Sequence, residues 1–240
     1  MAGEKLKLRI NNGEIIESVS VPKNIPRGEL EGILSERHFD FLYVDCQHDA
    51  HNEESLVEFC KMAEELSIPV QARIKHTRDA YLIGTYLDLG PSGIMVPEVK
   101  EEITVDEALD SFYYPQRGKR SWGGQNRMGF SERQGRLEYS NWWNETGFLT
   151  LQIESVEAVV NTRFLAKAGV DILSFGENDL MFSIEGDPEF PFRTQDECLR
   201  HVLNELQGTN VRVSMCPETE EAREKYLEMG VTIFNERRDQ

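Results

Sequence analysis

Several short apolar runs in this sequence end in charged or amide side chains. The runs Phe39–Asp45 and Gly147–Glu154, for example, end in carboxylates. A charged group beside a buried apolar segment costs free energy unless it is paired or binds something. These positions are therefore candidates for chemistry. The candidates at or just after the ends of such runs are Asp45, His48, Arg73, Gln152, Glu154, Asn178 and Asp179.

These residue types suit one kind of chemistry. Two carboxylates, Glu154 and Asp179, with waters and a bidentate oxygen substrate, suit a hard cation such as Mg²⁺ or Mn²⁺. Such a cation can polarise a 2-oxo acid through its keto and carboxylate oxygens. Arg73 can hydrogen-bond the developing enolate oxygen, and His48 can shuttle a proton through water. The backbone N–H groups of Asn178 and Asp179 can hold a carboxylate if they begin a helical turn.

Five of the seven candidates also have a purely structural interpretation. Asp45 could cap the next helix or anchor a loop, and His48 could be an ordinary loop histidine. Arg73 could be an ion-pair partner of Asp45 or Glu154. Glu154 and Asp179 could serve helix N-termini, because apolar helical patterns begin next to them. For single residues these alternatives stay open, whereas the convergence of all of them on one rim favours a site.

A strand-then-helix rhythm explains why the candidates converge. Eight short β-branched or apolar runs predict strands, and several are apolar throughout, as expected where both faces are buried. Alternating strands and helices imply a parallel sheet, and eight repeats predict an α/β fold, a single (β/α)₈ TIM barrel with its active site at the C-terminal strand ends. The predicted strands are Glu14–Val21, Phe39–Asp45, Pro69–Ile74, Gly93–Pro97, Gly147–Glu154, Val170–Phe175, Val211–Met215 and Val231–Phe234.

Helical patterns fill most of the intervals between these strands. An open, doubly wound sheet is the alternative fold. A dinucleotide-binding version would normally show a Gly-rich first turn, and none follows Val21. The predicted helices are Arg27–Glu36, Asn52–Leu66, Asp79–Leu89, Val105–Phe112, Val156–Ala168, Thr194–Leu206 and Thr219–Met229.

One interval is longer than the others. About fifty residues separate Pro97 from Gly147, and the excess holds all three tryptophans of the chain. Loops of this length are often functional lids, and a packed surface excursion is the alternative. We therefore expect a long loop at about residues 113–146, within a single barrel domain that spans residues 1–240.

Composition narrows the range of partners. The chain has 26 Lys and Arg against 43 Asp and Glu, a formal net charge of −17. Nucleic acids and anionic membranes need a basic surface, so neither is expected as a main partner. The chain has no apolar run near the roughly 18 residues of a membrane span and no apolar signal core at its N-terminus. Its four scattered cysteines, without a CxxC pair, are expected to be reduced thiols in a cytoplasmic protein.

Several motifs occur in an order that is typical of one known family. Together they resemble the HpcH/HpaI aldolase family, the class II pyruvate aldolases, over about residues 10–235. The Gln-x-Glu and Gly-x-x-Asp-Leu motifs, at this separation, are the most specific. The matching stretches are Phe39–His48, Pro69–Arg73, Gly93–Pro97, Tyr114-Pro115 with Gly118 and Arg120, Leu151–Glu154 and Gly176–Leu180.

The resemblance implies a pyruvate enolate held on a divalent metal, Mg²⁺, Mn²⁺ or another divalent ion, which reacts reversibly with an aldehyde. By its motifs, Glu154 and Asp179 look like the metal ligands. Arg73 looks like the enolate-stabilising residue. His48, oriented by Asp45, looks like the acid/base that acts through a metal-bound water.

The resemblance also bears on substrates and partners. By its motif, Gln152 looks like a residue that lines the pocket. Asn178 and Asp179 are the other expected substrate-binding residues, through the N–H groups described above. The implied small molecules are a 2-oxo acid and an aldehyde acceptor. The family usually continues into a last helix that packs on a neighbouring subunit, whereas this sequence ends soon after its eighth predicted strand. A homo-oligomer therefore stays open.

We expect a metal-dependent carbon–carbon lyase, an aldolase, that acts on a 2-oxo acid. Two alternatives stay open. One is related chemistry at the same site, such as decarboxylation or hydrolysis of an oxo acid, or condensation with an acyl-CoA thioester. For the acyl-CoA reaction, Arg117, Lys119 and Arg120 could bind the CoA. The other is a non-catalytic binding barrel, against which the intact set of candidate residues counts.

Overall fold

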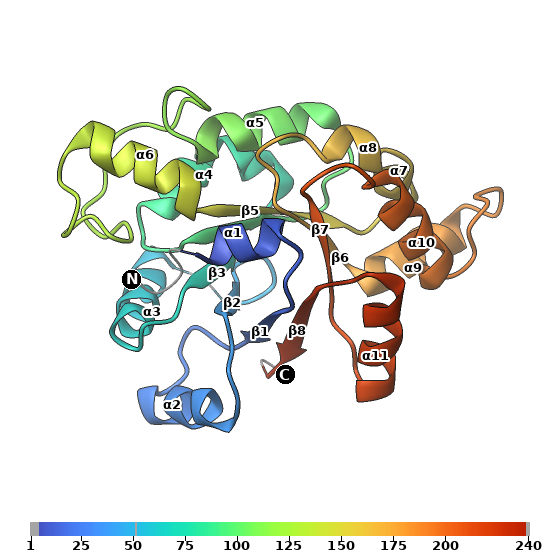
Figure 1. Ribbon diagram of the computed structural model, residues 1–240, viewed down its shortest axis with the longest axis horizontal. Coiled ribbons are helices and arrows are strands. Elements are labelled where there is room, and N and C mark those ends of the chain that lie inside the picture. Colours follow the sequence, from blue (N-terminus) through green and yellow to red (C-terminus); the bar gives the residue numbers. More distant parts are fainter. Residues whose placement is uncertain (1–4, 51, 239–240) are drawn as a thin grey trace.

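Eight parallel strands close into a barrel in which each strand pairs with its neighbours in sequence and β8 returns to β1 (Figure 1). The computed structural model describes residues 5–50 and 52–238. The (β/α)₈ barrel predicted from the sequence is confirmed, as is its organisation as a single domain. The strands are β1 (Ile16–Ser20), β2 (Phe41–Asp45), β3 (Val70–Arg73), β4 (Gly93–Val96), β5 (Phe148–Ile153), β6 (Ile172–Phe175), β7 (Arg212–Met215) and β8 (Ile233–Arg237).

Helices surround the barrel, and several begin at side-chain caps that the sequence supplies. Asn52 accepts a hydrogen bond from the Ser55 N–H, and Thr194 forms a capping box with Glu197. The helices are α1 (Leu6–Asn11), α2 (Arg27–Glu36), α3 (Glu53–Glu65), the 3₁₀ helix η1 (Thr77–Leu82), α4 (Ile83–Leu87), α5 (Glu102–Phe112), α6 (Arg136–Thr146), α7 (Val156–Val160), α8 (Thr162–Leu165), α9 (Glu177–Gly186), α10 (Gln195–Glu205) and α11 (Glu220–Met229).

The structure differs from the sequence-based helix assignment in two ways. The single helices predicted over Asp79–Leu89 and Val156–Ala168 are each two short helices. In addition, α1, α6 and α9 were not predicted. The pattern of α9 is not amphipathic, since Phe182 is exposed while Leu180 and Ile184 are buried, so hydrophobic periodicity could not reveal it.

Residues that alternate along the strands fill the barrel interior in layers. The layer nearest the N-terminal ends is apolar and comprises Ile16, Phe41, Phe148, Ile172 and Ile233. Gly93 completes this layer, because a Cβ there would lie 2.4 Å from the Phe148 ring. The next layers toward the C-terminal ends are polar, and they open into the pocket described below. The barrel is therefore closed at its N-terminal end.

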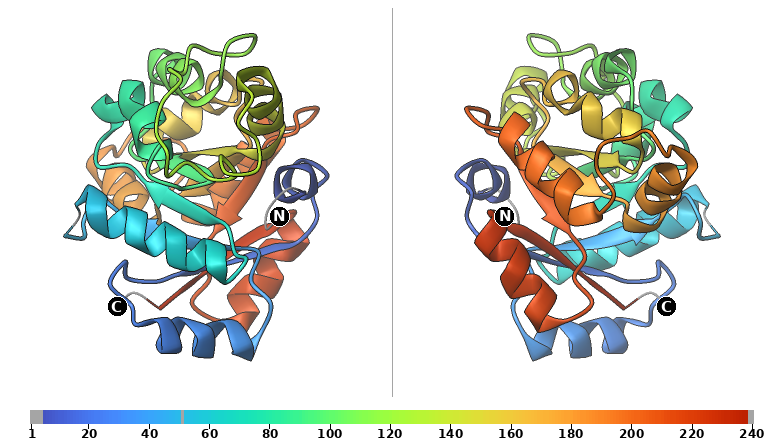
Figure 2. Two further views of the ribbon diagram at one scale, coloured as in Figure 1. Left: turned by 90° about the vertical axis from the view of Figure 1, so that its left-hand side faces the viewer. Right: turned by 90° about the vertical axis from the view of Figure 1, so that its right-hand side faces the viewer.

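Helix α1 covers that closed end. Lys7 on α1 is buried, and its Nζ donates to Tyr113 Oη (2.6 Å), the Gly147 carbonyl (2.8 Å) and Asp171 Oδ2 (3.1 Å). Asp171 Oδ2 also accepts from the Leu149 N–H at 2.9 Å. Both views in Figure 2 place α1 at the edge of the molecule beside α6, away from the C-terminal end of the chain.

The expected loop at residues 113–146 lies outside the pocket. It connects α5 to β5 and therefore approaches the N-terminal ends of the strands, opposite the face that carries active sites. Its last third is the helix α6, and among the described residues none of this segment lines the pocket at the C-terminal face. Arg120 in it is buried, with an ion pair to Asp88 and its guanidinium over the Trp143 ring. The segment is thus a packed excursion and not a lid.

Two further expectations from the sequence concern membranes and thiols. Among the described residues, no helix is both long and apolar enough to cross a bilayer. All four cysteines are free, and three of them are buried.

The contact between α1 and the barrel yields a stability prediction. We expect Lys7→Ala to lower the free energy of unfolding by about 3–5 kcal/mol, because it leaves the Asp171 carboxylate buried without its cation. Urea denaturation at pH 7, followed by circular dichroism, measures this. The double variant Lys7→Met/Asp171→Asn, which removes both charges, should cost less than Lys7→Ala. A loss below about 1 kcal/mol for Lys7→Ala would show that α1 does not depend on this ion pair.

Candidate active site

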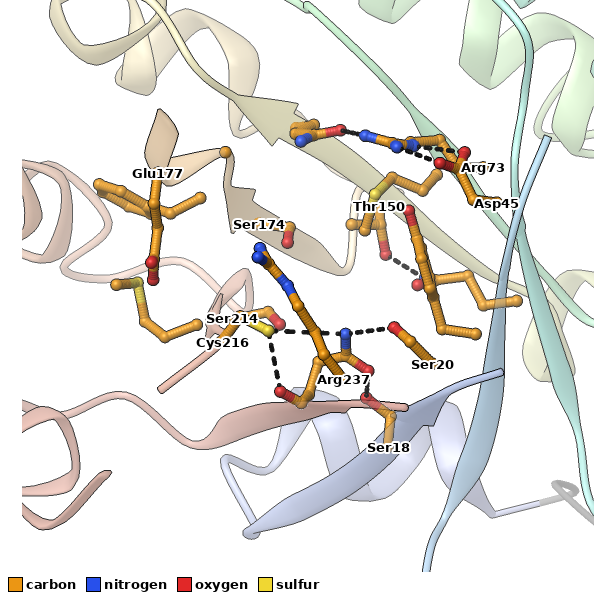
Figure 3. Close-up of a pocket in the computed structure, with 18 of the residues that line it drawn as sticks. Ser18, Ser20, Asp45, Arg73, Thr150, Ser174, Glu177, Ser214, Cys216 and Arg237 are labelled. Carbon is orange, nitrogen blue, oxygen red and sulfur yellow. Dashed lines mark hydrogen bonds and ion pairs between the residues drawn. The ribbon is translucent and has the colours of Figure 1, made fainter. Parts of the chain in front are cut away.

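A cavity of about 360 Å³ opens at the C-terminal ends of the strands (Figure 3). Six of the seven residues predicted from the sequence line it, namely Asp45, His48, Arg73, Gln152, Asn178 and Asp179. The seventh, Glu154, is 7% exposed and lies next to Gly176, which lines the cavity. The barrel therefore brings all the predicted residues to one end of the fold.

An ion pair in the cavity joins Arg73 to Asp45. Strand register places these two residues side by side on β2 and β3. Arg73 Nε donates to Asp45 Oδ1 at 2.9 Å and Nη2 donates to Oδ2 at 2.5 Å, a bidentate pair. Burial opposes the ionisation of Asp45, but the hydrogen bond and charge of Arg73, with the Gln47 N–H among the other contributions, together lower the pKa of the carboxyl. The pair is charged and fixed in orientation.

Asp45 is also held from the other side. Its Oδ1 accepts the Gln47 N–H at 2.8 Å, and its main-chain carbonyl accepts from Lys23 Nζ. Within the described residues, Asp45 forms no hydrogen bond with His48, so in this structure it orients Arg73 and not the histidine. His48 lies on an exposed part of the cavity wall.

Gln152 extends the contact from Arg73 across the barrel. Its Oε1 accepts from Arg73 Nη1 at 3.2 Å, and its side chain is largely buried. The guanidinium is thus held by groups from two strands that are not neighbours, β2 and β5. Its remaining N–H groups are available to a substrate oxygen.

Glu154 follows β5 and is desolvated. Its Oε1 accepts the Glu98 N–H at 2.6 Å. Burial, followed by repulsion from Asp179, raises the pKa of Glu154 to about 7. A Cβ at Gly176 would lie 2.3 Å from Glu154 Oε2, so only glycine permits this approach. The glycine of the Gly-x-x-Asp-Leu motif therefore makes room for the carboxylate.

Glu154 and Asp179 form a donor set that fits a hard divalent cation. Both are carboxylates, one is desolvated, and their mutual repulsion is what a bound dication would relieve. No group of three or more His, Cys, Asp or Glu side chains gathers in a metal-binding arrangement within the described residues. Two protein carboxylates with water and substrate oxygens are nevertheless the usual ligands of Mg²⁺.

The two residues that we expect to bind a substrate carboxylate lie at the start of α9. Asn178 and Asp179 are its second and third residues, and both line the cavity. Their backbone N–H groups belong to the first turn of a ten-residue helix, where N–H groups lack partners within the helix. The condition under which these N–H groups could hold a carboxylate is therefore met.

Several residues near the site were not identified from the sequence. Glu98 has a φ of +51°, a left-handed conformation that is uncommon outside glycine, and this conformation accompanies its N–H contact with Glu154. Lys23 anchors the end of β2. Arg237 lines the opposite part of the cavity with a group of serines. The alternation of Ile233, Asn235 and Arg237 was the available signal for this second wall.

Known proteins resemble this chain in sequence. A match to the HpcH/HpaI aldolase/citrate lyase family spans residues 34–225. The hydroxypyruvate/pyruvate aldolase of Chromohalobacter salexigens is 27% identical over 203 residues, which are 82% of this chain and 78% of that protein. A 4-hydroxy-2-oxo-heptane-1,7-dioate aldolase of Escherichia coli is 24% identical over 203 residues, 82% of this chain and 75% of that protein.

Solved structures agree with the barrel fold. The HpcH/HpaI aldolase from Desulfitobacterium hafniense superposes with a TM-score of 0.83 at 24% identity, covering 97% of this chain and 89% of that one. The citrate synthase SbnG superposes with a TM-score of 0.79 at 25% identity, covering 98% of this chain and 90% of that one. The relatives named as aldolases are carbon–carbon lyases, which confirms the enzyme class predicted from the sequence. The chain therefore belongs to the HpcH/HpaI aldolase/citrate lyase family.

Proposed function

We propose that this protein is a divalent-metal-dependent aldolase that forms or cleaves a carbon–carbon bond through the enolate of a pyruvate-type 2-oxo acid. The observation that carries the proposal is the Arg73 guanidinium, fixed by two hydrogen bonds to Asp45 in the cavity that Asp179 of the Gly-x-x-Asp-Leu motif lines. Glu154 of the Gln-x-Glu motif lies beside this cavity, next to Gly176. An arginine fixed in this way is arranged to stabilise an oxygen that gains negative charge.

The relatives support the substrate class. One is named a hydroxypyruvate/pyruvate aldolase and another a 4-hydroxy-2-oxo-heptane-1,7-dioate aldolase, and both names specify oxo acids. The shared element of such substrates is a keto group beside a carboxylate. This element suits a site with one fixed cation, two carboxylates and a helix N-terminus.

Each group has a distinct role in the proposed reaction. A divalent metal held by Glu154 and Asp179, when bound, would act as a Lewis acid toward the 2-oxo acid. Arg73 donates to the keto oxygen and stabilises it as charge develops there. The first N–H groups of α9, at Asn178 and Asp179, orient the substrate carboxylate.

His48 is the proton-transfer residue in this proposal. It lies at the exposed side of the cavity, where water and an incoming aldehyde have access. In the cleavage direction it accepts the proton from the hydroxyl group as the carbon–carbon bond breaks, and in the synthetic direction it returns that proton to the new alkoxide. Asp45 and Gln152 keep Arg73 in place throughout and do not exchange protons.

The alternative of acyl-CoA condensation finds no support in the cavity. The three basic residues considered for it lie in segment 113–146, whose described part does not reach the pocket. Arg117 instead donates to the Asn144 carbonyl, and Lys119 donates to Asp110. These cations stabilise the excursion itself.

Deuterium exchange tests enolate formation directly. We expect the protein with Mg²⁺ or Mn²⁺ to exchange the methyl protons of pyruvate in D₂O, as followed by ¹H NMR. A chelator should stop the exchange, and Glu154→Gln should slow it by more than about 100-fold. The matched control is Glu157→Gln, which alters an exposed glutamate on α7 and should exchange as the wild type does. Absence of exchange in the wild type with either metal would reject the pyruvate enolate and favour a different oxo acid or a binding role.

The orientation of Arg73 yields a second expectation. Arg73→Lys keeps the charge but cannot form the bidentate contact with Asp45, so the exchange rate should fall by about 10²–10³-fold. Arg78→Lys, at a nearby exposed arginine, is the control. Urea denaturation of both variants separates lost catalysis from lost folding. A rate within threefold of the wild type would show that a fixed guanidinium is not required.

The raised pKa of Glu154 yields a pH prediction for the chelated protein. Its pKa is about 7 in the folded state against an ordinary value of 4.5. The folded state therefore binds this proton more tightly than the unfolded state does. The resulting contribution to the free energy of unfolding is complete below about pH 4.5 and is lost as pH rises through 7. Between pH 4.5 and 8 the wild type should lose about 3 kcal/mol more unfolding free energy than Glu154→Gln. Equal pH slopes for the two proteins in urea denaturation would contradict the shift.

A further inference from the structure

The proposed reaction uses only one side of the cavity. The opposite wall is built by β1, β6, β7 and β8, and Figure 3 shows the Arg237 side chain pointing from β8 into the cavity, apart from the Arg73–Asp45 pair. The serine hydroxyl groups on this wall belong to Ser18, Ser20, Ser174 and Ser214. None of these side chains has a role in enolate formation.

The inward direction of Arg237 follows from the strand geometry. Side chains two residues apart point to the same face of a strand, and Ile233 and Asn235 on β8 both lie inside the barrel. Asn235 Nδ2 donates to Ser20 Oγ at 2.8 Å, and its Oδ1 accepts from Ser18 Oγ at 3.0 Å. These bonds between β8 and β1 fix the strand directly below Arg237.

The charge of Arg237 is not neutralised by a close carboxylate. The neighbouring Arg238 forms ion pairs with Glu36 and Glu236. For Arg237, by contrast, no carboxylate oxygen of the described residues lies within 4.0 Å of the guanidinium. Its charge acts on the Cys216 thiol and on Glu177 through electrostatic attraction, and it lowers the pKa of both groups against the effect of burial. In a chain with a net charge of −17, such a cation facing a cavity is a local attraction for anions.

Glu177 does not cancel this attraction. Burial raises the pKa of its carboxyl, which favours the neutral form and weakens its attraction for the guanidinium. The guanidinium of Arg237 keeps N–H donors that can form charge-assisted hydrogen bonds to a multi-oxygen anion.

We propose that Arg237, with the hydroxyl groups of Ser174 and Ser214, forms a second anion-binding subsite that holds a distal carboxylate or phosphate of the aldehyde half of the substrate. This inference rests on the proposed aldolase function and deepens it. The cavity, at about 360 Å³, has room for more than the three carbons of pyruvate at the Arg73 side. Arg237 would make the enzyme specific for an acceptor with a negative charge at the end remote from its carbonyl.

Binding measurements test the subsite without requiring turnover. With saturating Mg²⁺, isothermal titration of succinate, glutarate, adipate and glycerol 3-phosphate compares the wild type with Arg237→Gln and with the control Arg238→Gln. We expect at least one probe to bind, with a Kd that rises about tenfold to hundredfold in Arg237→Gln and changes less than twofold in Arg238→Gln. Whether the diacids or the phosphate depend on Arg237 identifies the anion. If no probe binds, or if both variants bind alike, the subsite is refuted.

Kinetics then connect the subsite to the reaction. We expect Arg237→Gln to exchange pyruvate protons at the wild-type rate but to lose about tenfold to hundredfold in kcat/KM for condensation of pyruvate with 4-oxobutanoate or glyceraldehyde 3-phosphate. Condensation with the neutral butanal should stay within twofold. Equal losses with neutral and charged aldehydes would refute the specificity role. If the wild type exchanges no pyruvate at all, the aldolase proposal fails, while the titrations still decide whether Arg237 binds anions.

Discussion

The closure of eight parallel strands is the constraint on which the site depends. Because β8 pairs with β1, all the strand ends lie on a single ring, and residues far apart in sequence become neighbours. The register between β2 and β3 sets Asp45 beside Arg73, and the span from β3 to β5 lets Gln152 hold the same guanidinium. A slip of one residue in either strand would turn these side chains out of the barrel.

The two ends of the barrel differ in how their buried charges are compensated. At the closed end, Lys7 and Asp171 are buried together, and each compensates the charge of the other. At the open end, Glu154 is desolvated beside another carboxylate, with only a backbone N–H and a more distant arginine in compensation. Burying Glu154 beside another carboxylate lowers the stability of the fold. Such destabilising arrangements occur at active sites, where a bound cation or substrate offsets the loss. The asymmetry supports assigning structure to one end and chemistry to the other.

The cavity itself has two polar walls that differ in rigidity. The Arg73 wall is tied by bidentate and buried contacts, as stabilisation of a charge at a defined atom requires. The Arg237 wall presents an exposed cation above a small network of serine and asparagine hydrogen bonds. A wall that recognises a charged group needs less exact geometry than a wall that stabilises a reacting oxygen. This division agrees with the separate roles that we propose for the two arginines.

Much of the fold could be read from the sequence, because buried parallel strands leave continuous apolar runs and alternate with amphipathic helices. All eight strands were predicted, as were the residues at their C-terminal ends, since a barrel places any strand end at the same rim. The helix α9 was missed because its buried and exposed apolar residues do not follow one face. Segment 113–146 was expected to be a loop that might act as a lid, although its position between a helix and the next strand puts it at the closed end.

By itself, the sequence determined the strand order, the family motifs and the identity of the groups at the rim, all of which are local patterns. Only the tertiary structure decided which of these groups touch. Among the described residues, the Asp45 carboxylate accepts from Arg73 and the Gln47 N–H and not from His48. Glu98 has a left-handed conformation, and its N–H contacts Glu154. Arg237 faces the cavity because β8 pairs with β1. Such pairings depend on strand register and through-space distance, and neither quantity is encoded in the spacing of residues along the chain.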